Sequence, residues 1–379
     1  MFPAISDLGY LRVKDLSILY YFSAALIALA VSLGLTPLMI SMSRKLKILD
    51  MPNPRKSHTK PMPLMGGVAM FIATAAATLV YVLVISGLPD FPKKLPLDLG
   101  LVVAFLVGIT GVTAMGLIDD IMHLSARRRL VILFILALIV LVGCLQFYFP
   151  ASLMQSGLAV VLLVSVVVVV WIVGVTNAIN FADGLDGLAS TLSLISAVGF
   201  AALFYLQGRT QLALPTALSL CGAIAGFLPF NINRAKIFMG DAGSMFIGFM
   251  LGVFTIMSMS EEAIKDFIVP VYLMVVPIAD MSMSVLRRLI MKKPVMQPDN
   301  LHFHHVLNRK LKSQTLTVVV LALVQAASAA AGVLIYRFEL YMLGWVVMAI
   351  VAFAAVVYTV VRSLKLLEAE RAVSSAPEK

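Results

Sequence analysis

The feature that most constrains the fold of this chain is a series of long apolar stretches, each close to the length of a membrane span. Eleven of them occur in 379 residues, at approximately 16–42, 64–87, 98–117, 130–149, 157–175, 188–207, 211–230, 237–257, 266–286, 315–336 and 340–361. A helix of about 20 apolar residues crosses a bilayer core about 30 Å thick. Only 13% of the residues are charged and 61% are hydrophobic. The sequence therefore predicts an all-α polytopic membrane protein with about 11 transmembrane helices.

Lysine and arginine are concentrated on one side of these predicted spans. If the loop 43–63 lies in the cytoplasm, 22 of the 29 Lys and Arg residues fall in cytoplasmic segments. The positive-inside rule then places the N-terminus outside and the C-terminus in the cytoplasm. The net charge of +10 reflects this topology, and we expect no nucleic acid partner because that would require a soluble basic face. Cys144 and Cys221 lie in apolar spans without metal or disulfide spacing, and we expect them to face lipid or to pack.

The polar residues are distributed as unevenly as the charges. Five predicted cytoplasmic segments, 43–63, 118–129, 176–188, 231–243 and 287–314, are rich in functional side chains, whereas the five external connections are short and plain. We expect a single integral-membrane domain over residues 1–365, with its active site built from these five segments, and a cytoplasmic tail over 366–379. A protein with this asymmetry carries out chemistry at one membrane face.

Aspartates supply the first half of that chemistry. Asp119, Asp120, Asp183, Asp186, Asp241 and Asp280 lie in or next to apolar spans, where a carboxylate costs at least a few kcal/mol and is normally partnered and functional. For any single one, reaching water and capping a helix is an equally good explanation. Together, carboxylate and asparagine oxygens at one face suit a hard cation such as Mg²⁺.

Cationic side chains in the same loops supply the second half. They are Arg55, Lys56, His58, Lys60, Arg127, Arg128, Arg129, Arg287, Arg288, His302, His304 and His305. Cations opposite a magnesium site are typical of a phosphate or pyrophosphate clamp. In a membrane protein, the expected substrates are a phosphorylated lipid and a soluble donor that carries phosphate.

Glycines punctuate the polar segments. In "PLMGG" and "MGDAGS" they either let backbone N–H groups approach an anion or allow close packing, and packing is favoured for Gly66 and Gly67. In "NAINFADGLDGLAST" the polar residues recur every three positions, so a regular helix would aim Asn177 and Asp186 in opposite directions. Gly184 and Gly187 allow the chain to turn back, which predicts a helix end followed by a loop.

Five motifs in sequence order carry a family resemblance over Asp50 to about Leu311. They are "DMPNPRKSHTKPMPLMGG", "GLIDDIMHLSARRR", "NAINFADGLDGLA", "FMGDAGS" and "PDNLHFHH". The chain resembles the polyprenyl-phosphate N-acetylhexosamine-1-phosphate transferases, which include the phospho-N-acetylmuramoyl-pentapeptide transferase. "PNPRKSH" and "PDNLHFHH" resemble the N-acetylglucosamine branch, since Phe303 interrupts the three contiguous histidines usual in the muramoyl-pentapeptide branch.

The resemblance implies a reaction. A magnesium-dependent enzyme, with Mn²⁺ as a possible substitute, would transfer GlcNAc-1-phosphate from a UDP-N-acetylhexosamine to undecaprenyl phosphate in the bacterial inner membrane, releasing UMP. The lipid-linked product would start a cell-envelope glycan such as O-antigen, common antigen or a teichoic acid linker. The wrapped loop at 177–187 would hold the nucleotide diphosphate.

The resemblance also implies roles for individual residues. Asp119, Asp120 and His305 would be catalytic, and Asp241 and Asn180 would bind the metal. Asn177, Asp183, Asp186, Asn231 and Phe238 would surround the nucleoside, with Phe238 stacked on uracil, and Lys56, His58, Arg288, His302 and His304 would contact phosphate or sugar. A phosphate monoester is mostly dianionic at pH 7 because its second pKa is about 6, so we expect the aspartate pair to position groups more than to remove a proton.

Alternatives remain open at this point. The donor could carry FucNAc, QuiNAc, GalNAc or MurNAc-pentapeptide, and a homodimer is compatible with the sequence. A carboxylate-coupled secondary transporter is the main rival from another class, but transporters place charges near the midplane between inverted repeats, and no repeat is evident. A non-catalytic lipid-binding scaffold would require a broken motif, and every aspartate is present.

Overall fold

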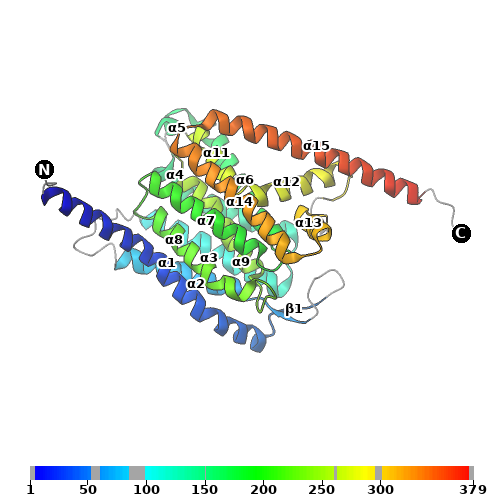
Figure 1. Ribbon diagram of the computed structural model, residues 1–379, viewed down its shortest axis with the longest axis horizontal. Helices are drawn as coiled ribbons and strands as arrows, with labels where there is room; N and C mark the ends of the chain where they lie inside the picture. The colour runs from blue at the N-terminus through cyan, green and yellow to red at the C-terminus, as the bar shows by residue number, and fades with distance from the viewer. Residues whose placement is uncertain are drawn as a thin grey trace.

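The computed structural model of the chain describes residues 5–52, 60–84, 99–149, 151–259, 263–294 and 301–374, and it is a bundle of long helices with one small pair of strands (Figure 1). The helices are α1 (Ile5–Leu46), α2 (Gly66–Leu83), α3 (Leu99–Met122), α4 (Ala126–Tyr148), α5 (Ala151–Gln155), α6 (Leu158–Ala182), α7 (Leu188–Leu206), α8 (Ala213–Asn231), α9 (Gly240–Met257), α10 (Ala263–Asp266), α11 (Ile268–Leu273), α12 (Val275–Ile290), α13 (Phe303–Leu311), α14 (Gln314–Arg337) and α15 (Tyr341–Ser374). Within these ranges, ten helices are long and apolar enough to cross a membrane. The predicted all-α polytopic membrane fold is confirmed.

The ninth predicted span, 266–286, is interrupted. Its residues form α10, α11 and α12, with a break at Met274 between the last two helices. Gln325 of α14 reaches into this break, where its amide nitrogen donates to the Leu273 carbonyl at 2.5 Å and its oxygen accepts the Val276 N–H at 3.0 Å. Backbone groups within a bilayer need partners inside the protein, so one glutamine on a neighbouring helix makes the interruption tolerable.

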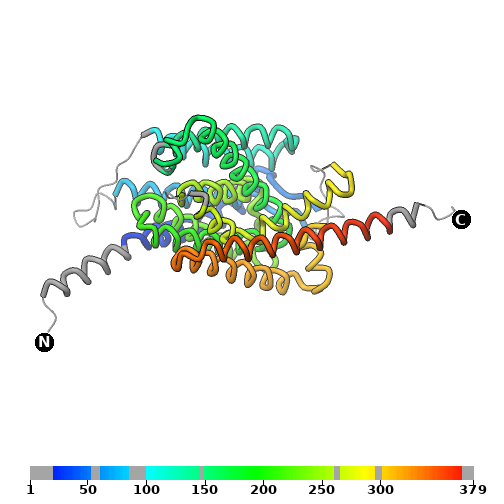
Figure 2. The backbone as a smooth tube through the Cα atoms, turned by 90° about the horizontal axis from the view of Figure 1, so that it is seen from above, coloured from blue at the N-terminus to red at the C-terminus, as the bar shows by residue number. Residues whose placement is uncertain are grey.

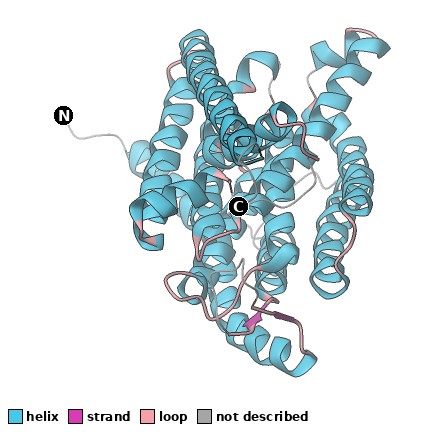
Figure 3. Ribbon diagram, turned by 90° about the vertical axis from the view of Figure 1, so that its right-hand side faces the viewer, coloured by secondary structure: helices cyan, strands magenta, loops and turns pink. Residues whose placement is uncertain are grey.

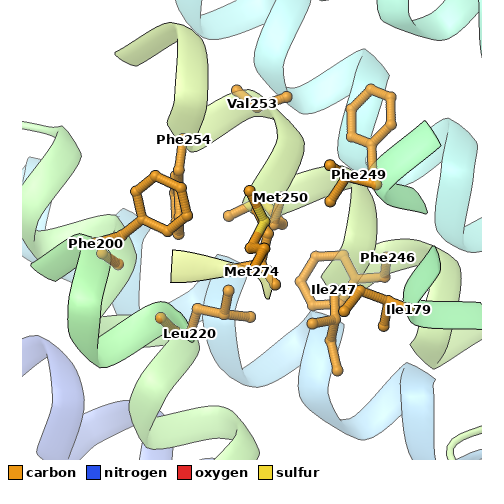
Figure 4. Packing of buried hydrophobic residues seen from close by; sticks show 14 of the residues in the cluster. Ile179, Phe200, Leu220, Phe246, Ile247, Phe249, Met250, Val253, Phe254 and Met274 are labelled. Carbon is orange, nitrogen blue, oxygen red and sulfur yellow. The ribbon is translucent and has the colours of Figure 1, made fainter. Parts of the chain in front are cut away.

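Helix α9 occupies the centre of the bundle. It is almost completely buried and packs against α2, α3, α6, α7 and α8. Figure 4 shows its side chains Phe246, Phe249, Met250 and Phe254 enclosed by residues of the surrounding helices. Phe254 meets the Phe200 ring of α7 with centroids 5.7 Å apart, an edge-on arrangement favoured by aromatic quadrupoles.

Small residues allow the neighbours of α9 to approach its first turns. A Cβ placed on Gly67 of α2 would lie 2.1 Å from the Gly243 nitrogen, and one on Gly116 of α3 would lie 2.5 Å from the Asp241 carbonyl oxygen. On the α6 side, a Cβ on Gly248 would lie 2.7 Å from the Thr176 Cα. Membrane helices associate through such close packing of small residues. Backbones of α2, α3 and α6 are therefore held around the start of α9.

One end of the bundle gathers the polar connections. Strand β1 (Leu49–Asp50) pairs antiparallel with β2 (Met62–Pro63) at the right-hand end in Figure 1, where α13 also lies. Helix α15 runs along the upper side of the bundle and α1 along its lower side in Figure 1. Figure 2 looks down on α15, which crosses over the bundle, and Figure 3 views the end that carries the strands. Helix α15 continues to Ser374, past the expected start of a tail at 366. Cys144 and Cys221 are both buried, so both pack inside the protein.

Candidate functional site

A cavity of about 580 Å³ lies among these polar connections, within the size range of small-molecule sites. Five carboxylates line it, from Asp50, Asp120, Asp183, Asp186 and Asp241. Its other lining residues in the described part of the chain are Leu64, His123, Asn180, Gly184, Leu185, Asn231, Phe238, Gly240, His305 and Asn308. Neither lysine nor arginine is among these residues, so the described wall is strongly acidic.

Asp120 fixes the start of α9 to the end of α3. Its two carboxylate oxygens accept the N–H groups of Asp241 at 2.8 Å and Ala242 at 3.1 Å. The first N–H groups of a helix have no partners within the helix and attract negative charge. The anion at this N-terminus is thus a side chain of the protein itself. Gly240 makes the approach possible, because it has φ +69° and a Cβ there would lie 2.5 Å from Asp120 Oδ2.

Asp119 is not among the residues that line the cavity, and it organises the connection between α3 and α4. It is buried, and its oxygens accept the Leu124 N–H at 2.6 Å and the Arg129 guanidinium at 2.8 Å. The same Arg129 nitrogen lies 3.7 Å from Asp241 Oδ2. Arg129 therefore links the two aspartates and partly balances the negative charge at the edge of the site.

Asn180 and Asp241 form the contact between α6 and α9. The Asn180 amide nitrogen donates to Asp241 Oδ1 at 2.6 Å and to Ser244 Oγ at 2.9 Å. Both residues line the cavity, and the sequence predicted them as a metal-binding pair. Their proximity across a separation of 61 residues leaves carboxylate and amide oxygens at the cavity wall, which is the donor chemistry that Mg²⁺ prefers.

The stretch 177–191 is a helix end followed by a tight turn, as predicted. Helix α6 continues to Ala182, and α7 starts at Leu188 after Gly187, which has φ +74°. The turn places Asp183 in the cavity wall, where burial and the neighbouring carboxylates of Asp241, Asp186 and Asp50 raise its pKa to about 7. Carboxylates crowded in this way favour a bound cation, because a cation lowers the cost of ionising each one.

Asp186 and Asn231 hold the opposite wall in place. Asp186 accepts the Ala235 N–H at 3.0 Å, and the buried Asn231 amide accepts from Ser190 Oγ at 2.7 Å and donates to the Ile237 carbonyl at 3.1 Å. These bonds shape the connection between α8 and α9 that carries Phe238, whose backbone N–H donates to the Pro63 carbonyl at 2.8 Å. Phe238 is half-buried at the cavity and supplies an aromatic surface there.

The histidines of α13 separate into two environments. His305 lines the cavity, and burial together with the nearby His304 and His302 lowers its pKa to about 4. It is therefore neutral at pH 7 and is not part of a cationic clamp. His302 and His304 lie behind it against Asp280, and the three side chains offer ligand atoms within 4.8 Å of one another.

The structure does not bring every predicted residue to the cavity. Asn177 donates to the Val173 carbonyl of its own helix at 2.7 Å, and neither it nor Arg288 is among the lining residues. Arg288 is buried at the end of α12. Lys56 and His58 lie outside the described residues. The roles of these four residues remain predictions.

Asp50, His123 and Asn308 line the cavity and were not assigned to the site from sequence. Asp50 opens the first polar motif and His123 follows the aspartate pair, so their positions in the motifs were an available signal. Asn308 lies one helical turn after His304 and His305 on α13, and only the orientation of that helix reveals it.

Gly66 and Gly67 serve packing, the favoured of the two predicted explanations. Their N–H groups donate to the carbonyls of Phe238 at 3.1 Å and Met239 at 2.9 Å. A Cβ on Gly66 would lie 2.4 Å from the Phe227 ring. These N–H groups therefore join α2 to the residues before α9.

Comparison with known proteins identifies the family of the chain. The sequence model of glycosyl transferase family 4 matches residues 102–259, which include most of α3 and all of α6 and α9. A Bacillus subtilis protein named as a probable undecaprenyl-phosphate N-acetylglucosaminyl 1-phosphate transferase is 30% identical over 303 residues, covering 79% of this chain and 81% of the relative. The chain belongs to glycosyl transferase family 4.

Two further relatives come from other bacteria. An undecaprenyl-phosphate alpha-N-acetylglucosaminyl 1-phosphate transferase of Thermotoga maritima is 30% identical over 293 residues, with 76% of this chain and 83% of the relative covered. A decaprenyl-phosphate N-acetylglucosaminephosphotransferase of Mycolicibacterium smegmatis is 30% identical over 276 residues, with 67% of each chain covered. The family resemblance found in the five motifs is confirmed, and the protein is a membrane-embedded transferase of family 4.

Proposed function

We propose that this family 4 transferase moves GlcNAc-1-phosphate from UDP-GlcNAc to undecaprenyl phosphate, releasing UMP and leaving a lipid-linked pyrophosphoryl sugar. The observation that carries the proposal is the acidic cavity at one end of an apolar helix bundle. It has the volume for a nucleotide sugar and is lined by five carboxylates. The names of three relatives, each a polyprenyl-phosphate N-acetylglucosamine phosphotransferase, support the choice of sugar and lipid.

The cavity fits a divalent cation. Asp241, Asp183 and the oxygen of Asn180 would hold it, since all three line the cavity. Burial, together with the carboxylates of Asp241, Asp186 and Asp50, raises the pKa of Asp183. Mg²⁺ takes such oxygen ligands and completes its shell with water and substrate phosphates. When bound, it supplies charge stabilisation at the pyrophosphate oxygens.

The protein side chains act mainly by positioning. Asp120 fixes the first turn of α9, and so the backbone of Asp241, through its two N–H contacts. Asp119 has both oxygens occupied by Leu124 and Arg129, so it sets the loop that carries Arg129 rather than removing a proton. Phe238 offers a stacking surface for uracil, and Asp186 holds the loop on which Phe238 lies.

The reaction needs little acid–base help. An oxygen of the lipid phosphate attacks the pyrophosphate phosphorus that bears the sugar, the bond from this phosphorus to the bridging oxygen breaks, and that oxygen leaves with UMP. The attacking phosphate is mostly dianionic at pH 7 because its second pKa is about 6. Orientation and charge stabilisation are therefore the main contributions of the site.

The membrane arrangement follows from the same proposal. Soluble UDP-GlcNAc requires the cavity to open to the cytoplasm, which agrees with the lysine and arginine distribution and with an external N-terminus. The lipid acceptor would come from the bacterial inner membrane. The product would start a cell-envelope glycan.

The test uses purified protein in detergent with undecaprenyl phosphate and radiolabelled UDP-GlcNAc. We expect a lipid-linked product and UMP with Mg²⁺ or Mn²⁺ and none with EDTA. UDP-GalNAc, UDP-FucNAc, UDP-QuiNAc and UDP-MurNAc-pentapeptide should be poorer donors. Transfer from one of these in preference to UDP-GlcNAc would overturn the proposed sugar, and transfer in EDTA would overturn the metal.

A matched pair of variants tests the site. Asp241→Asn should lower the rate more than about a hundredfold, as expected when a group that organises transition-state charge is removed. Asp266→Asn changes another buried carboxylate, in α10, which is not among the residues that line the cavity, and should retain activity. Equal activity of the two variants would contradict the assignment.

A further inference from the structure

Asp280 of α12 is a buried carboxylate with no part in the cavity lining. Its Oδ1 accepts the Phe303 N–H at 2.6 Å, and its Oδ2 lies 2.5 Å from His304 Nδ1. His302 Nδ1 is 3.5 Å from Oδ1 and 3.1 Å from Ser284 Oγ. One carboxylate therefore ties the first turn of α13 to α12.

The other nitrogen of His304 is buried without a partner. His304 is 2% exposed, and its Nε2 makes no hydrogen bond to any residue that the structure describes. The Nε2 atom of His304 lies close to Gly184. A Cβ placed on that glycine would lie 2.6 Å from His304 Nε2 and 3.3 Å from His305 Nε2. Gly184 and His305 both line the cavity. Only a glycine thus separates this nitrogen from the site.

The contact with Asp280 determines what Nε2 can do. A carboxylate accepts hydrogen bonds only, so the proton of the neutral imidazole must be on Nδ1, and Nε2 then carries a lone pair. A buried acceptor without a partner is costly. A hydroxyl or amide N–H of a molecule bound in the cavity, directly or through one ordered water, would satisfy it.

A metal ion held by Asp280, His302 and His304 is the competing explanation. Bonds of about 2.0 Å at a tetrahedral ion place two ligand atoms about 3.3 Å apart. The 2.5 Å separation between Asp280 Oδ2 and His304 Nδ1 is too short for two ligands of one ion, and it is closer to the length of about 2.7–2.9 Å of a hydrogen bond from a ring N–H to an ionised carboxylate. A shared proton accounts for this contact better than a shared metal.

We propose that Asp280 is a positioning residue that holds His304 with its Nε2 as a hydrogen-bond acceptor for the sugar-nucleotide donor, next to Gly184. This inference rests on the proposed function for its donor, UDP-GlcNAc. The structural part of the inference, which is the dependence of the His304 tautomer on Asp280, is independent of the proposed function. Donor binding, and not lipid binding, is the property that Asp280 should control.

Asp280→Asn tests the tautomer with almost no change in shape. If the new amide oxygen keeps the Phe303 N–H, its NH₂ group faces His304 Nδ1, which must then accept. The proton moves to Nε2, and the acceptor becomes a donor. The chain has five histidines, so ¹⁵N-histidine spectra at about pH 8, where ordinary imidazoles are neutral, can be assigned by the signal lost in His304→Asn.

Kinetics test the function of the acceptor. The amide of His304→Asn can reach the position of Nδ1 and keep the contact with Asp280, but it has no atom at the position of Nε2. We expect Asp280→Asn and His304→Asn each to raise the KM for UDP-GlcNAc about tenfold, equivalent to about 1.4 kcal/mol, with the KM for undecaprenyl phosphate unchanged when both are measured below the melting temperature of the variant. The double variant should be no worse than either single one, because the two residues act as a unit.

Several results would refute the inference. They are an Nε2–H tautomer in the wild type, multiplying KM effects in the double variant, or equal effects on both substrates. Strong Zn²⁺ binding lost in Asp280→Asn would favour the metal explanation instead. Asp266→Asn is the control for changing a buried carboxylate to an amide. If wild-type protein transfers no sugar from UDP-GlcNAc, the proposed function fails, and the histidine spectra still decide whether Asp280 holds His304.

Discussion

Replacing Gly67 with alanine tests whether the start of α9 is positioned by helix packing. The added Cβ would lie 2.1 Å from the Gly243 nitrogen, 2.3 Å from the Gly243 Cα and 2.6 Å from the Ala242 carbonyl carbon. Ordinary contact begins at 3.4 Å, so the nearest atom is about 1.3 Å too close. All three atoms belong to the backbone, and no side-chain rotation can relieve the clash.

The expected cost has two parts. Overpacking of a well-packed core costs about 1–3 kcal/mol, and a backbone clash belongs at the upper end, so we expect about 3 kcal/mol. Separation of α2 from α9 would also stretch the 2.9 Å hydrogen bond from the Gly67 N–H to the Met239 carbonyl. The same movement would shift Asp241 relative to Asp120. A displacement of about 1 Å at a reaction site can lower a rate about a hundredfold.

Thermal unfolding with a thiol-reactive dye measures the first effect. Cys144 and Cys221 are buried, so they react when the bundle opens. Gly174→Ala is the matched control, because its Cβ would meet only Met281 Cε at 3.9 Å and alanine favours helix by about 1 kcal/mol. We expect Gly67→Ala to melt lower and lose transferase activity while the control melts at or above the wild type. A Gly67→Ala protein as stable and active as the control would refute the packing argument.

Two further predictions concern other parts of the molecule. Gln325→Leu removes the side-chain groups that bond the Leu273 carbonyl and the Val276 N–H at the break. It should lower the free energy of unfolding by about 2–4 kcal/mol, since each buried group left unsatisfied costs about 1–3 kcal/mol. Thermal unfolding measures this loss, and an unchanged melting temperature would contradict it. The pKa of Asp183 is raised from the ordinary 3.8 to about 7. Without a bound metal, in EDTA, the native state therefore binds more protons than the unfolded chain between these two pH values. The free energy of unfolding of the wild type should then fall as the pH rises from 3.8 to about 7. Asp183→Asn should show a weaker fall, and identical pH profiles of the melting temperature would refute the assignment.

Much of the fold could be predicted from the sequence because the bilayer imposes a simple rule. Apolar stretches of about 20 residues must be helical to pair their own backbone groups, and ten of the eleven predicted spans correspond to long apolar helices in the described ranges. The remaining one, the ninth predicted span at 266–286, shows the limit of the rule. Its hydropathy does not reveal the break at Met274, because the tolerance for that break comes from Gln325 on α14, 51 residues later in the chain.

The candidate site was predictable in part. Asp120 was expected in a catalytic pair, Asn180 and Asp241 at a metal, and Asp183 and Asp186 around the nucleoside. All five line one cavity. Motif order and the cost of membrane carboxylates identified them without any knowledge of distances. Neither signal distinguishes a residue that faces the cavity from one that supports it.

Supporting residues required the tertiary structure. Asp119 and Asp120 are adjacent in sequence, yet one pairs with Arg129 and the other binds the N-terminus of α9, because consecutive positions near a helix end point in different directions. His305 is expected to be cationic from its residue type and neighbours, but burial makes it neutral at pH 7. Side-chain direction and burial decide such roles, and both arise from contacts between distant segments.

The sequence by itself determined that this chain is a helical membrane protein with oxygen-rich motifs at one face, since hydropathy and residue type are local properties. Only the tertiary structure decided which groups meet. Gly67 and Gly243 bring α2 against α9, and Gly184 leaves room for His304 beside the cavity. Close approach of two backbones depends on the absence of a side chain at one specific crossing point, and the position of that crossing is a property of the packed bundle.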